Sequence, residues 1–265
     1  MTKHFLYILS ILLMSWANSS FGQTVKTLTD TVPDTTNNKV RLEQQNFKNT
    51  VRLKAIIIPS VALAYGFVKL GSNALTKLDV EAKHEFYSEH PHKKFIIDDY
   101  MQFAPGAAVF ALNGLGIKGK NSLLDQSGVY LLSNIILNGT TQSLKRITNV
   151  TRPDGTSNAF PSGHTAEAFA SAEFLRREYG DQSVWYTVSG YGAATIVGLM
   201  RMYNNKHWFS DVVAGAGLGV LSTQASYWLY PKIKKMLTGK NVQGLITLPS
   251  YNQGAIGVGI VRVFK

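Results

Sequence analysis

The chain is divided into apolar blocks of helical length separated by short polar joints, and this spacing restricts the fold more than any other feature. The blocks are longer than ordinary strands and rich in Ala, Leu, Gly and Met, which predicts helices. Helices of this kind bury their apolar faces against one another. We therefore expect an all-α bundle of about six core helices, over residues 51–70, 101–117, 126–150, 163–179, 183–203 and 208–230.

The joints contain residues that end one helix and begin the next. Gly180, followed by Asp181 and Ser183, predicts a helix end and a new helix cap. Pro153 and Pro161 enclose a polar segment that predicts a loop. In the last block we expect close helix contact at three glycines: Gly215, Gly217 and Gly219.

The N-terminal region differs from the blocks that follow it. Lys3 and His4 precede the uncharged run 5–16, and small residues come next, which is the layout of a secretory signal peptide. Residues 23–50 are rich in Thr and lack apolar periodicity, so they predict a disordered linker. We expect export to the periplasm or cell envelope, with a signal peptide over 1–22, a linker over 23–50 and the helical domain over 51–235.

The C-terminal extension, residues 236–265, has a different pattern. Ile256, Val258 and Ile260 alternate with other residues after Asn252 and its neighbours Gln253 and Gly254. Period-two alternation beyond a turn-forming segment predicts a short β-hairpin.

Composition excludes several classes of protein. The chain has no cysteine, which removes disulfide frameworks, thiol catalysis and thiolate metal sites. The net charge of +11 favours anionic partners. No dense block of Lys and Arg is present, so we expect a phosphate or a membrane surface as the partner and no nucleic acid.

The sequence leaves the relation to a membrane open. Three uncharged runs are near the ~20 residues that a helical span requires: 126–144, 182–200 and 212–231. Block 163–179, in contrast, contains three Glu and two Arg, which are costly on a lipid-facing helix. The mean hydropathy of −0.01 is also low for an embedded chain. An integral or peripheral membrane bundle and a soluble exported bundle are both compatible with this pattern.

Three clusters of basic and imidazole side chains lie at the joints. The first is Lys145 with Arg152 and Pro153. If one helix carries both cations, their separation of seven positions places them on one face, where they could bind one anion. Pro153 would then end that helix just beyond the arginine.

The second cluster is Pro161, Ser162, Gly163 and His164, directly before an apolar block. A serine and a glycine that open a helix present free backbone N–H groups at the positive end of the helix dipole. This arrangement predicts an anion site with His164 at its rim.

The third cluster is Arg201, His207 and Asp211. On a helix, a carboxylate four positions after a histidine can reach one imidazole nitrogen and determine which nitrogen is free to react. Taken alone, each cluster also fits an ordinary solvated face, helix cap or surface pair. Together they form a set that can stabilise and attack a phosphoryl group.

In this order and spacing the clusters resemble the type 2 phosphatidic acid phosphatase (PAP2) and vanadium haloperoxidase superfamily, over about residues 100–231. The resemblance implies an all-helical core and phosphoester hydrolysis without a metal or another cofactor. It implies that His207 attacks phosphorus to give a phosphohistidine, Asp211 orients it, and His164 protonates the departing oxygen. The phosphoryl oxygens would be held by Lys145, Arg152, Ser162, Gly163 and Arg201.

Two further expectations follow for this site. The field of three cations should favour a neutral His207, whereas His164 must be protonated to act as an acid, and this combination predicts a bell-shaped pH profile. Met200 occupies the position where the family usually has a serine, and a thioether cannot donate a hydrogen bond. We expect a tuned or weaker site there, because the charged groups are all retained.

The sequence thus predicts an envelope phosphatase acting on a lipid-linked phosphate such as phosphatidate, an isoprenoid diphosphate or a lipid A phosphate. The predicted export, the excess of Lys and Arg over Asp and Glu, and the apolar helices beside the site all fit a substrate with an anionic headgroup on an apolar tail. A soluble secreted acid phosphatase of broad specificity is the alternative. A vanadium haloperoxidase and a non-catalytic phosphate-binding envelope protein rank below both.

Overall fold

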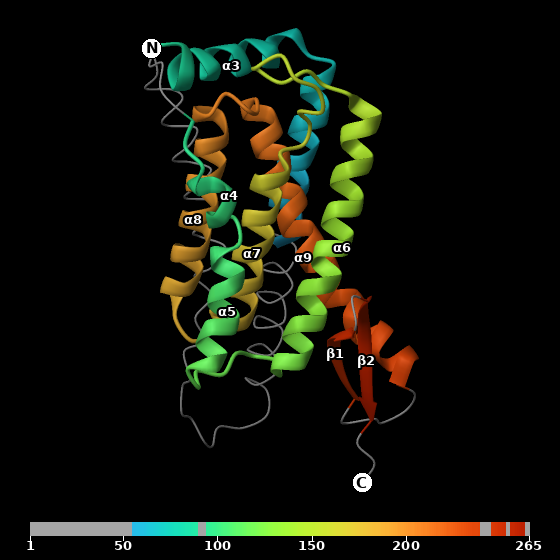
Figure 1. The fold of residues 1–265 in the computed structure, drawn as a ribbon. Helices are drawn as coiled ribbons and strands as arrows, with labels where there is room; N and C mark the ends of the chain where they lie inside the picture. The colour runs from blue at the N-terminus through green and yellow to red at the C-terminus, as the bar shows by residue number, and fades with distance from the viewer. Residues whose placement is uncertain (1–54, 90–93, 239–244, 253–254, 263–265) are drawn as a thin grey trace, which may run out of the picture.

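The computed structural model describes residues 55–89, 94–238, 245–252 and 255–262. Within these ranges the chain is a bundle of helices with one C-terminal hairpin (Figure 1), so the predicted all-α class is confirmed. The predicted signal peptide and Thr-rich linker lie outside the described residues.

The helices match the predicted blocks closely, apart from two helices that the sequence analysis missed, α3 and α4. The C-terminal helix also runs through Pro231, beyond its predicted end. In chain order the helices are Ala55–Leu70, α3 (Asn73–Lys83) with the π-helical turn His84–Ser88, α4 (Ile97–Met101), α5 (Ala104–Gly114), α6 (Leu123–Thr148), α7 (Gly163–Tyr179), α8 (Val184–Tyr203) and α9 (Phe209–Thr238).

Helix α7 is the centre of the bundle and contacts α5, α6, α8 and α9. Most of its residues are buried, including the small residues Ala166, Ala170 and Ala172 that let its neighbours approach. As predicted, α7 ends at Gly180, and Ser183 caps α8 by accepting a hydrogen bond from the N–H of Trp185.

The charged residues of α7 are paired within the protein. Buried Glu173 accepts hydrogen bonds from Arg176 Nε at 2.6 Å and from Tyr191 Oη at 2.6 Å. Burial raises the pKa of this carboxyl, but the neighbouring Arg176 and Arg177 bring it down to about 2. Glu178 accepts from Gln126 Nε2 at 2.9 Å and from further donors. The charges of block 163–179 are therefore satisfied inside the bundle, which removes the cost that a lipid-facing position would impose.

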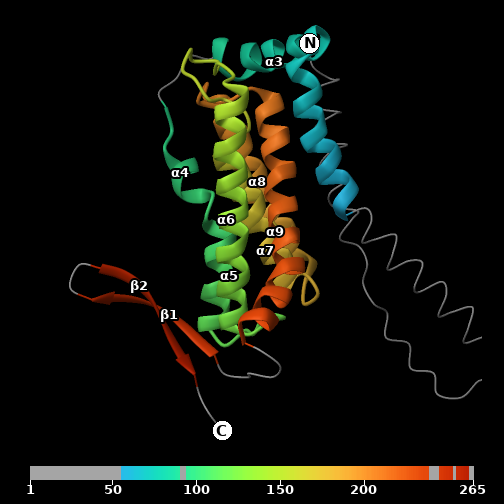
Figure 2. The ribbon, with the colours of Figure 1, turned by 90° about the vertical axis from the view of Figure 1, so that its right-hand side faces the viewer.

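The glycines of α9 allow the close contacts predicted for them. A Cβ atom on Gly219 would collide with the carbonyl oxygen of Ala166 in α7, and a Cβ on Gly215 would lie 2.6 Å from the carbonyl oxygen of Ser162. Gly217 similarly faces the backbone at Pro59 in the helix Ala55–Leu70. Figure 2 shows that helix beside α9.

The helix Ala55–Leu70 and the segment Asn73–Ser88 meet at a bend of 102°, so that α3 lies across one end of the bundle (Figure 1). By length and composition, none of the described helices qualifies alone as a membrane span, and only this bent pair qualifies when its two parts are taken together.

The predicted C-terminal hairpin is present. Strands β1 (Leu245–Asn252) and β2 (Ala255–Arg262) pair antiparallel, with Asn252 opposite Ala255 and Leu245 opposite Arg262. The two strands are separated only by residues 253–254, the segment in which the sequence indicated a turn.

We expect Gly219→Ala to lower the free energy of unfolding by about 1–3 kcal/mol, because the added methyl group has no room against the α7 backbone. Gly192→Ala is the matched control, because it lies on an exposed face of α8 and a methyl group added there would have no atom within 4 Å. There the better helix propensity of Ala should leave stability unchanged or raise it by up to about 1 kcal/mol. Denaturant unfolding of both variants measures the difference, and equal stabilities would contradict the packing argument.

Candidate active site

The predicted site residues lie where the ends of α6, α7, α8 and α9 meet beneath α3 (Figure 1). Each comes from the end of a helix or from an adjoining loop, so the bundle fixes the position of every one. Lys145 is in the last turn of α6, and Arg152 is in the loop between α6 and α7. The start of α7 carries Ser162, Gly163 and His164. Arg201 is in the last turn of α8, His207 lies just before α9, and Asp211 is in the first turn of α9.

Lys145 and Arg152 do not share a helix, so that part of the sequence argument was wrong. Helix α6 ends at Thr148, and Asn149 takes a left-handed conformation with φ of 44° that turns the chain away. Arg152 then lies in a loop in which its N–H donates to the carbonyl of Thr156 at 2.7 Å. The helix thus ends before Pro153, and the folding of the loop places the arginine near Lys145.

The loop is also held by the lysine. Lys145 Nζ donates to the carbonyl oxygens of Asn158 at 2.7 Å and Ala159 at 3.4 Å. Lys145 therefore anchors the segment that leads to the second cluster, in addition to supplying a positive charge.

His207 and Asp211 are not on one helix either, because α9 begins at Phe209. They are nevertheless adjacent: His207 Nδ1 lies 3.5 Å from Asp211 Oδ2, and both side chains are almost fully buried. The N–H of Trp208 donates to Asp211 Oδ2 at 2.9 Å and orients the carboxylate. Since Nδ1 faces the acid, Nε2 is the nitrogen that is free to react.

The second cluster forms a helix start, as predicted. Ser162 is the N-cap of α7, and its N–H donates to the carbonyl of Asp211 at 3.0 Å, which joins the second cluster to the third. Its hydroxyl pairs with the hydroxyl of Thr165 at 2.9 Å. At Gly163 an added Cβ would have only Thr141 nearby, at 3.8 Å, so the first turn of α7 is open to a ligand.

Electrostatics show that the groups converge. Burial lowers the pKa of His207 well below its usual value, and the charges of Arg201, Lys145, Arg152 and His164 lower it further. The ring is therefore neutral, as the sequence predicted, although burial is a larger cause than the cations. Burial and the neighbouring Arg152 lower the pKa of Lys145 to about 8. Three cations and two imidazoles thus act on one another in one site.

Several buried polar atoms in this region have no hydrogen-bond partner among the described residues. In native proteins such atoms are rare and usually mark a bound polar ligand or water. Five belong to the site and its border: Thr141 Oγ1, Arg152 Nε, Arg201 Nε, His207 Nδ1 and Asp211 Oδ1. His207 Nδ1 faces Asp211 Oδ2 at 3.5 Å, so the atoms of this set that suit an oxyanion are the donors Arg152 Nε and Arg201 Nε.

Comparison with known proteins agrees with this geometry. Residues 154–235 match the model of a family described as the PAP2 superfamily. This part of the chain is therefore similar to the PAP2 superfamily. The matched region includes the second and third clusters, whereas Lys145 and Arg152 precede it.

Among curated proteins, the chain is 40% identical over 152 residues to the lipid A 1-phosphatase of Porphyromonas gingivalis, covering 55% of this chain and 33% of that protein. It is 38% identical over 76 residues to the bacitracin transport permease protein BcrC of Bacillus licheniformis, covering 29% of this chain and 36% of that protein. The chain therefore spans about a third of the length of the curated relatives that it matches.

Two solved structures are also similar. One is LpxE of Aquifex aeolicus, with 22% identity, a TM-score of 0.45, and coverage of 57% of this chain and 95% of that one. The other is the first transmembrane PAP2 type phosphatidylglycerolphosphate phosphatase of Bacillus subtilis, with 21% identity, a TM-score of 0.46, and coverage of 67% and 98%.

The structure adds two acidic residues to the candidate site that the sequence analysis missed, Asp98 and Asp99 of α4. Asp98 is buried and accepts from Arg201 Nη1 at 2.5 Å. Asp99 Oδ1 lies 2.8 Å from His164 Nε2. The only sequence signal for them is a pair of adjacent acids just before the apolar block 101–117, and nothing in that pattern specifies their partners.

These carboxylates and His164 could be mistaken for a metal site, since their donor atoms lie within 4.8 Å of one another. Their hydrogen bonds instead go to Arg201, to Asn204 and between Asp99 and His164. Because a guanidinium is already bound to these carboxylates, we interpret the cluster as an ion-pair network.

The protonation of His164 results from opposing influences. Burial and the charge of Arg201 lower its pKa, whereas the hydrogen bond and charge of Asp99 raise it, and the net result is a pKa below the usual value. For Asp211, burial dominates and raises the pKa to about 6.

We expect Asp99→Asn to lower the pKa of His164 further, because the substitution removes the carboxylate that stabilises the imidazolium. The ring would then lose its proton at a lower pH than in the wild-type protein. An NMR titration of the His164 ring measures the shift without requiring any enzymatic activity. Asp181→Asn is the control, because that side chain is 88% exposed and pairs with Lys120. A rise in the His164 pKa, or no change, would contradict the role assigned to Asp99.

Proposed function

We propose that this protein is a phosphatase that hydrolyses a phosphate monoester or diphosphate through a phosphohistidine on His207, without a metal ion. The observation that carries the proposal is that the charges of Lys145, Arg152 and Arg201 all act on a neutral, buried His207 just before α9, with the start of α7 joined to this cluster through Ser162 and Asp211. Three positive side chains and a helix N-terminus provide for the phosphoryl oxygens what a metal ion provides in other phosphatases.

The chemistry follows from the positions of the groups. His207 Nε2 attacks phosphorus, while Asp211 stabilises the positive charge that develops on the ring through Nδ1. The bond from phosphorus to the leaving oxygen breaks, and the protonated form of His164 gives that oxygen its proton, so this step is favoured at a pH below the lowered pKa of His164. His164, now neutral, takes a proton from water as the water attacks the phosphohistidine. Inorganic phosphate leaves and His207 is regenerated.

We further propose that the phosphate is attached to a lipid. The relative from Porphyromonas gingivalis bears the name lipid A 1-phosphatase. In this chain, apolar side chains of α4 and its flanks are exposed around Asp99: Ile96 is 60% exposed, Ile97 56% and Tyr100 74%. The residue that holds the proton donor thus lies within an apolar surface, where the tail of a substrate would lie as its headgroup enters the site.

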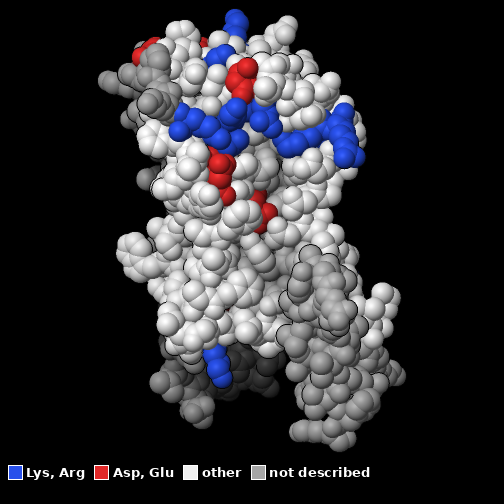
Figure 3. All heavy atoms as spheres, viewed as in Figure 1, with Lys and Arg blue, Asp and Glu red and all other residues white. Residues whose placement is uncertain are grey.

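The charge distribution on one face of the molecule supports the same substrate class. Figure 3 shows Lys and Arg gathered in a band across the molecule near the site, with a largely uncharged surface below it. The helices beneath carry no charged residue over 100–117, 126–144 and 182–200. A basic band above an uncharged surface fits an anionic lipid headgroup and its tails. We therefore propose that the protein acts at the membrane of the cell envelope, after export.

Phosphate release tests the proposal directly. We expect release from lipid phosphates, unaffected by a chelator, and a fall of about 10⁴-fold or more in His207→Ala, because the attacking nitrogen is lost. Enzyme labelled with phosphate from the substrate is then treated with acid or with base. A phosphohistidine is lost in acid and retained in base, whereas a phosphoester is retained in acid. The control His84→Ala removes an imidazole that is 66% exposed and should retain full activity.

Each alternative has its own outcome in this experiment. Activity restricted to water-soluble esters would indicate the soluble acid phosphatase. Halide oxidation with added vanadate and no phosphate release would indicate a haloperoxidase. Binding of phosphate esters without hydrolysis in the wild-type protein would indicate a binding protein. Loss of activity on chelation would contradict the metal-independent mechanism.

The apolar surface of α4 gives a second prediction. The double substitution Ile97→Ser and Tyr100→Ser should raise KM for a lipid phosphate by about tenfold, because contact area for the tail is lost. Hydrolysis of p-nitrophenyl phosphate, which has no tail, should be unchanged. Leu115→Ser is the control, since that residue is 77% exposed at the far end of α5. Equal effects on both substrates would show that these side chains of α4 support the catalytic site and do not bind the lipid tail.

A further inference from the structure

A buried ion pair outside the three clusters lies directly behind the third one. Lys69 Nζ is 2.9 Å from Asp79 Oδ2, and the two side chains are 11% and 1% exposed. Lys69 comes from the helix Ala55–Leu70 and Asp79 from α3. Both residues lie outside the region 154–235 that matches the PAP2 model. A buried ion pair is a weak source of stability, so its position requires another reason.

Asp79 binds the start of α9. Its Oδ1 accepts a hydrogen bond from the N–H of Ser210 at 2.9 Å, and its Oδ2 accepts from the hydroxyl of Ser210 at 2.8 Å. Because Ser210 directly precedes Asp211, this carboxylate fixes the backbone that carries the acid of the site. A carboxylate at a helix N-terminus is also favourably placed in the helix dipole.

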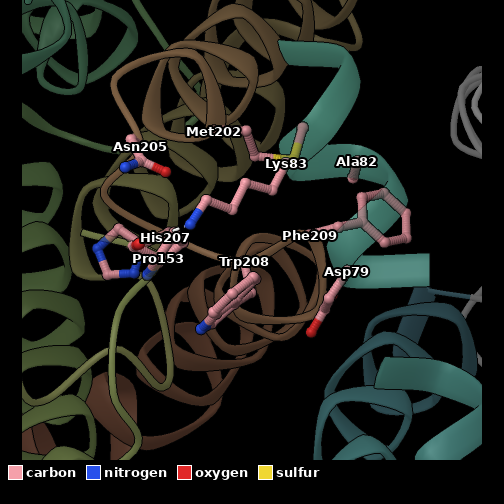
Figure 4. A pocket seen from close by; sticks show the side chains of 9 residues that line it. All are labelled: Asp79, Ala82, Lys83, Pro153, Met202, Asn205, His207, Trp208 and Phe209. Atoms are coloured by element: carbon pink, nitrogen blue, oxygen red, sulfur yellow. Dashed lines mark hydrogen bonds between the residues drawn. The ribbon is translucent and has the colours of Figure 1, made fainter. Parts of the chain in front are cut away.

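Lys69 and its neighbour Lys83 bind the other side of the same segment. Lys69 Nζ lies 5.6 Å from the centre of the Trp208 ring, and Lys83 Nζ lies 5.7 Å from it. Lys83 Nζ also donates to the carbonyl of Pro153 at 2.9 Å. Figure 4 shows Lys83 reaching from α3 toward Pro153 and His207, with the Trp208 ring below it.

Trp208 connects these contacts to the site. Its backbone N–H donates to the Asp211 carboxylate, and its indole N–H donates to the carbonyl of Thr151 at 2.7 Å, beside Arg152. The first and third clusters are therefore held together through one ring and two lysines.

We infer that Lys69 and Asp79 are positioning residues for the proposed reaction: they hold Ser210 and Trp208, and thereby hold Asp211 against His207. The inference rests on the proposed function. It assigns to the N-terminal helix pair a role in aligning the acid with the nucleophile.

The charge of Lys69 has a separate effect that can be measured. The charged groups that act on Asp211 are Lys69 from the first helix, Lys145 from α6 and Arg152 from the loop, and His207 is its neighbour within the third cluster. Burial raises the pKa of Asp211 to about 6, and Lys69 acts to lower it. Asp211 must be ionised to stabilise the His207 ring, so activity is lost as pH falls through this pKa. Removing the Lys69 charge raises the pKa, and the loss then begins at a higher pH.

The test compares Lys69→Gln with the wild-type protein across pH, using p-nitrophenyl phosphate. We expect kcat to fall while KM changes by less than about twofold, and the acid limb of kcat/KM to move to higher pH by about half a unit or more. Lys69→Arg retains the charge and should keep the wild-type acid limb. Lys77→Gln removes an exposed lysine from α3 and is the matched control.

The inference would be overturned if folded Lys69→Gln showed the same acid limb of kcat/KM as the wild type and Lys77→Gln. If Lys69→Gln does not fold, the variant Ser210→Ala replaces it, because this substitution removes one of the two hydrogen bonds to Asp79. A fall of about tenfold in kcat would support the inference. A wild-type kcat would overturn it. A wild-type protein that releases no phosphate from any ester would refute the proposed function instead. The NMR titration of the His207 ring would then still report the ionisation of Asp211 in wild type and Lys69→Gln.

Discussion

The close contact between α7 and α9 is the constraint on which the rest of the structure depends. Gly215 and Gly219 let the two backbones approach, and the N–H of Ser162 donates to the carbonyl of Asp211 at their junction. This one contact joins the anion-binding helix start to the acid of the nucleophile. Any larger side chain on this face of α9 would separate the two halves of the site, so packing and chemistry impose the same requirement on these positions.

Around that contact the protein buries charge in two different ways. In the body of the bundle, the carboxylates of α7 accept hydrogen bonds from neighbouring side chains, as Glu173 does from Arg176 and Tyr191 and Glu167 does from Tyr130. At the site, Arg152, Arg201 and His207 each keep a buried polar atom without a partner among the described residues. The first arrangement costs little once formed, and it makes the scaffold rigid. The second is unfavourable, and in the proposed reaction a phosphate oxygen would supply the partners that the two guanidinium groups lack.

Much of this could be predicted from the sequence, because helix-length apolar blocks and their end signals are local. The six core helices and the C-terminal hairpin were predicted in this way, and so were the residues that meet at the site apart from Asp98 and Asp99. The geometry that brings them together was not predictable. Lys145 and Arg152 meet because Asn149 ends α6 in a left-handed turn, and that depends on how the following loop packs.

The sequence analysis missed helices α3 and α4 for a different reason. Helix α4 is only five residues long, and its acids find their partners about 65 and 103 positions later in the chain. No local pattern encodes contacts at that range. Helix α3 has a polar composition, and its one fully buried acid, Asp79, binds Ser210 at a separation of 131 residues.

Asp98 and Asp99 are consecutive residues of one short helix, and one holds the cation of α8 while the other holds the imidazole of α7. The two functions cannot be adjusted independently, because any displacement of α4 moves both carboxylates together. In the proposed reaction, a small molecule bound beneath this helix would therefore displace the phosphate-binding arginine and the proton donor together.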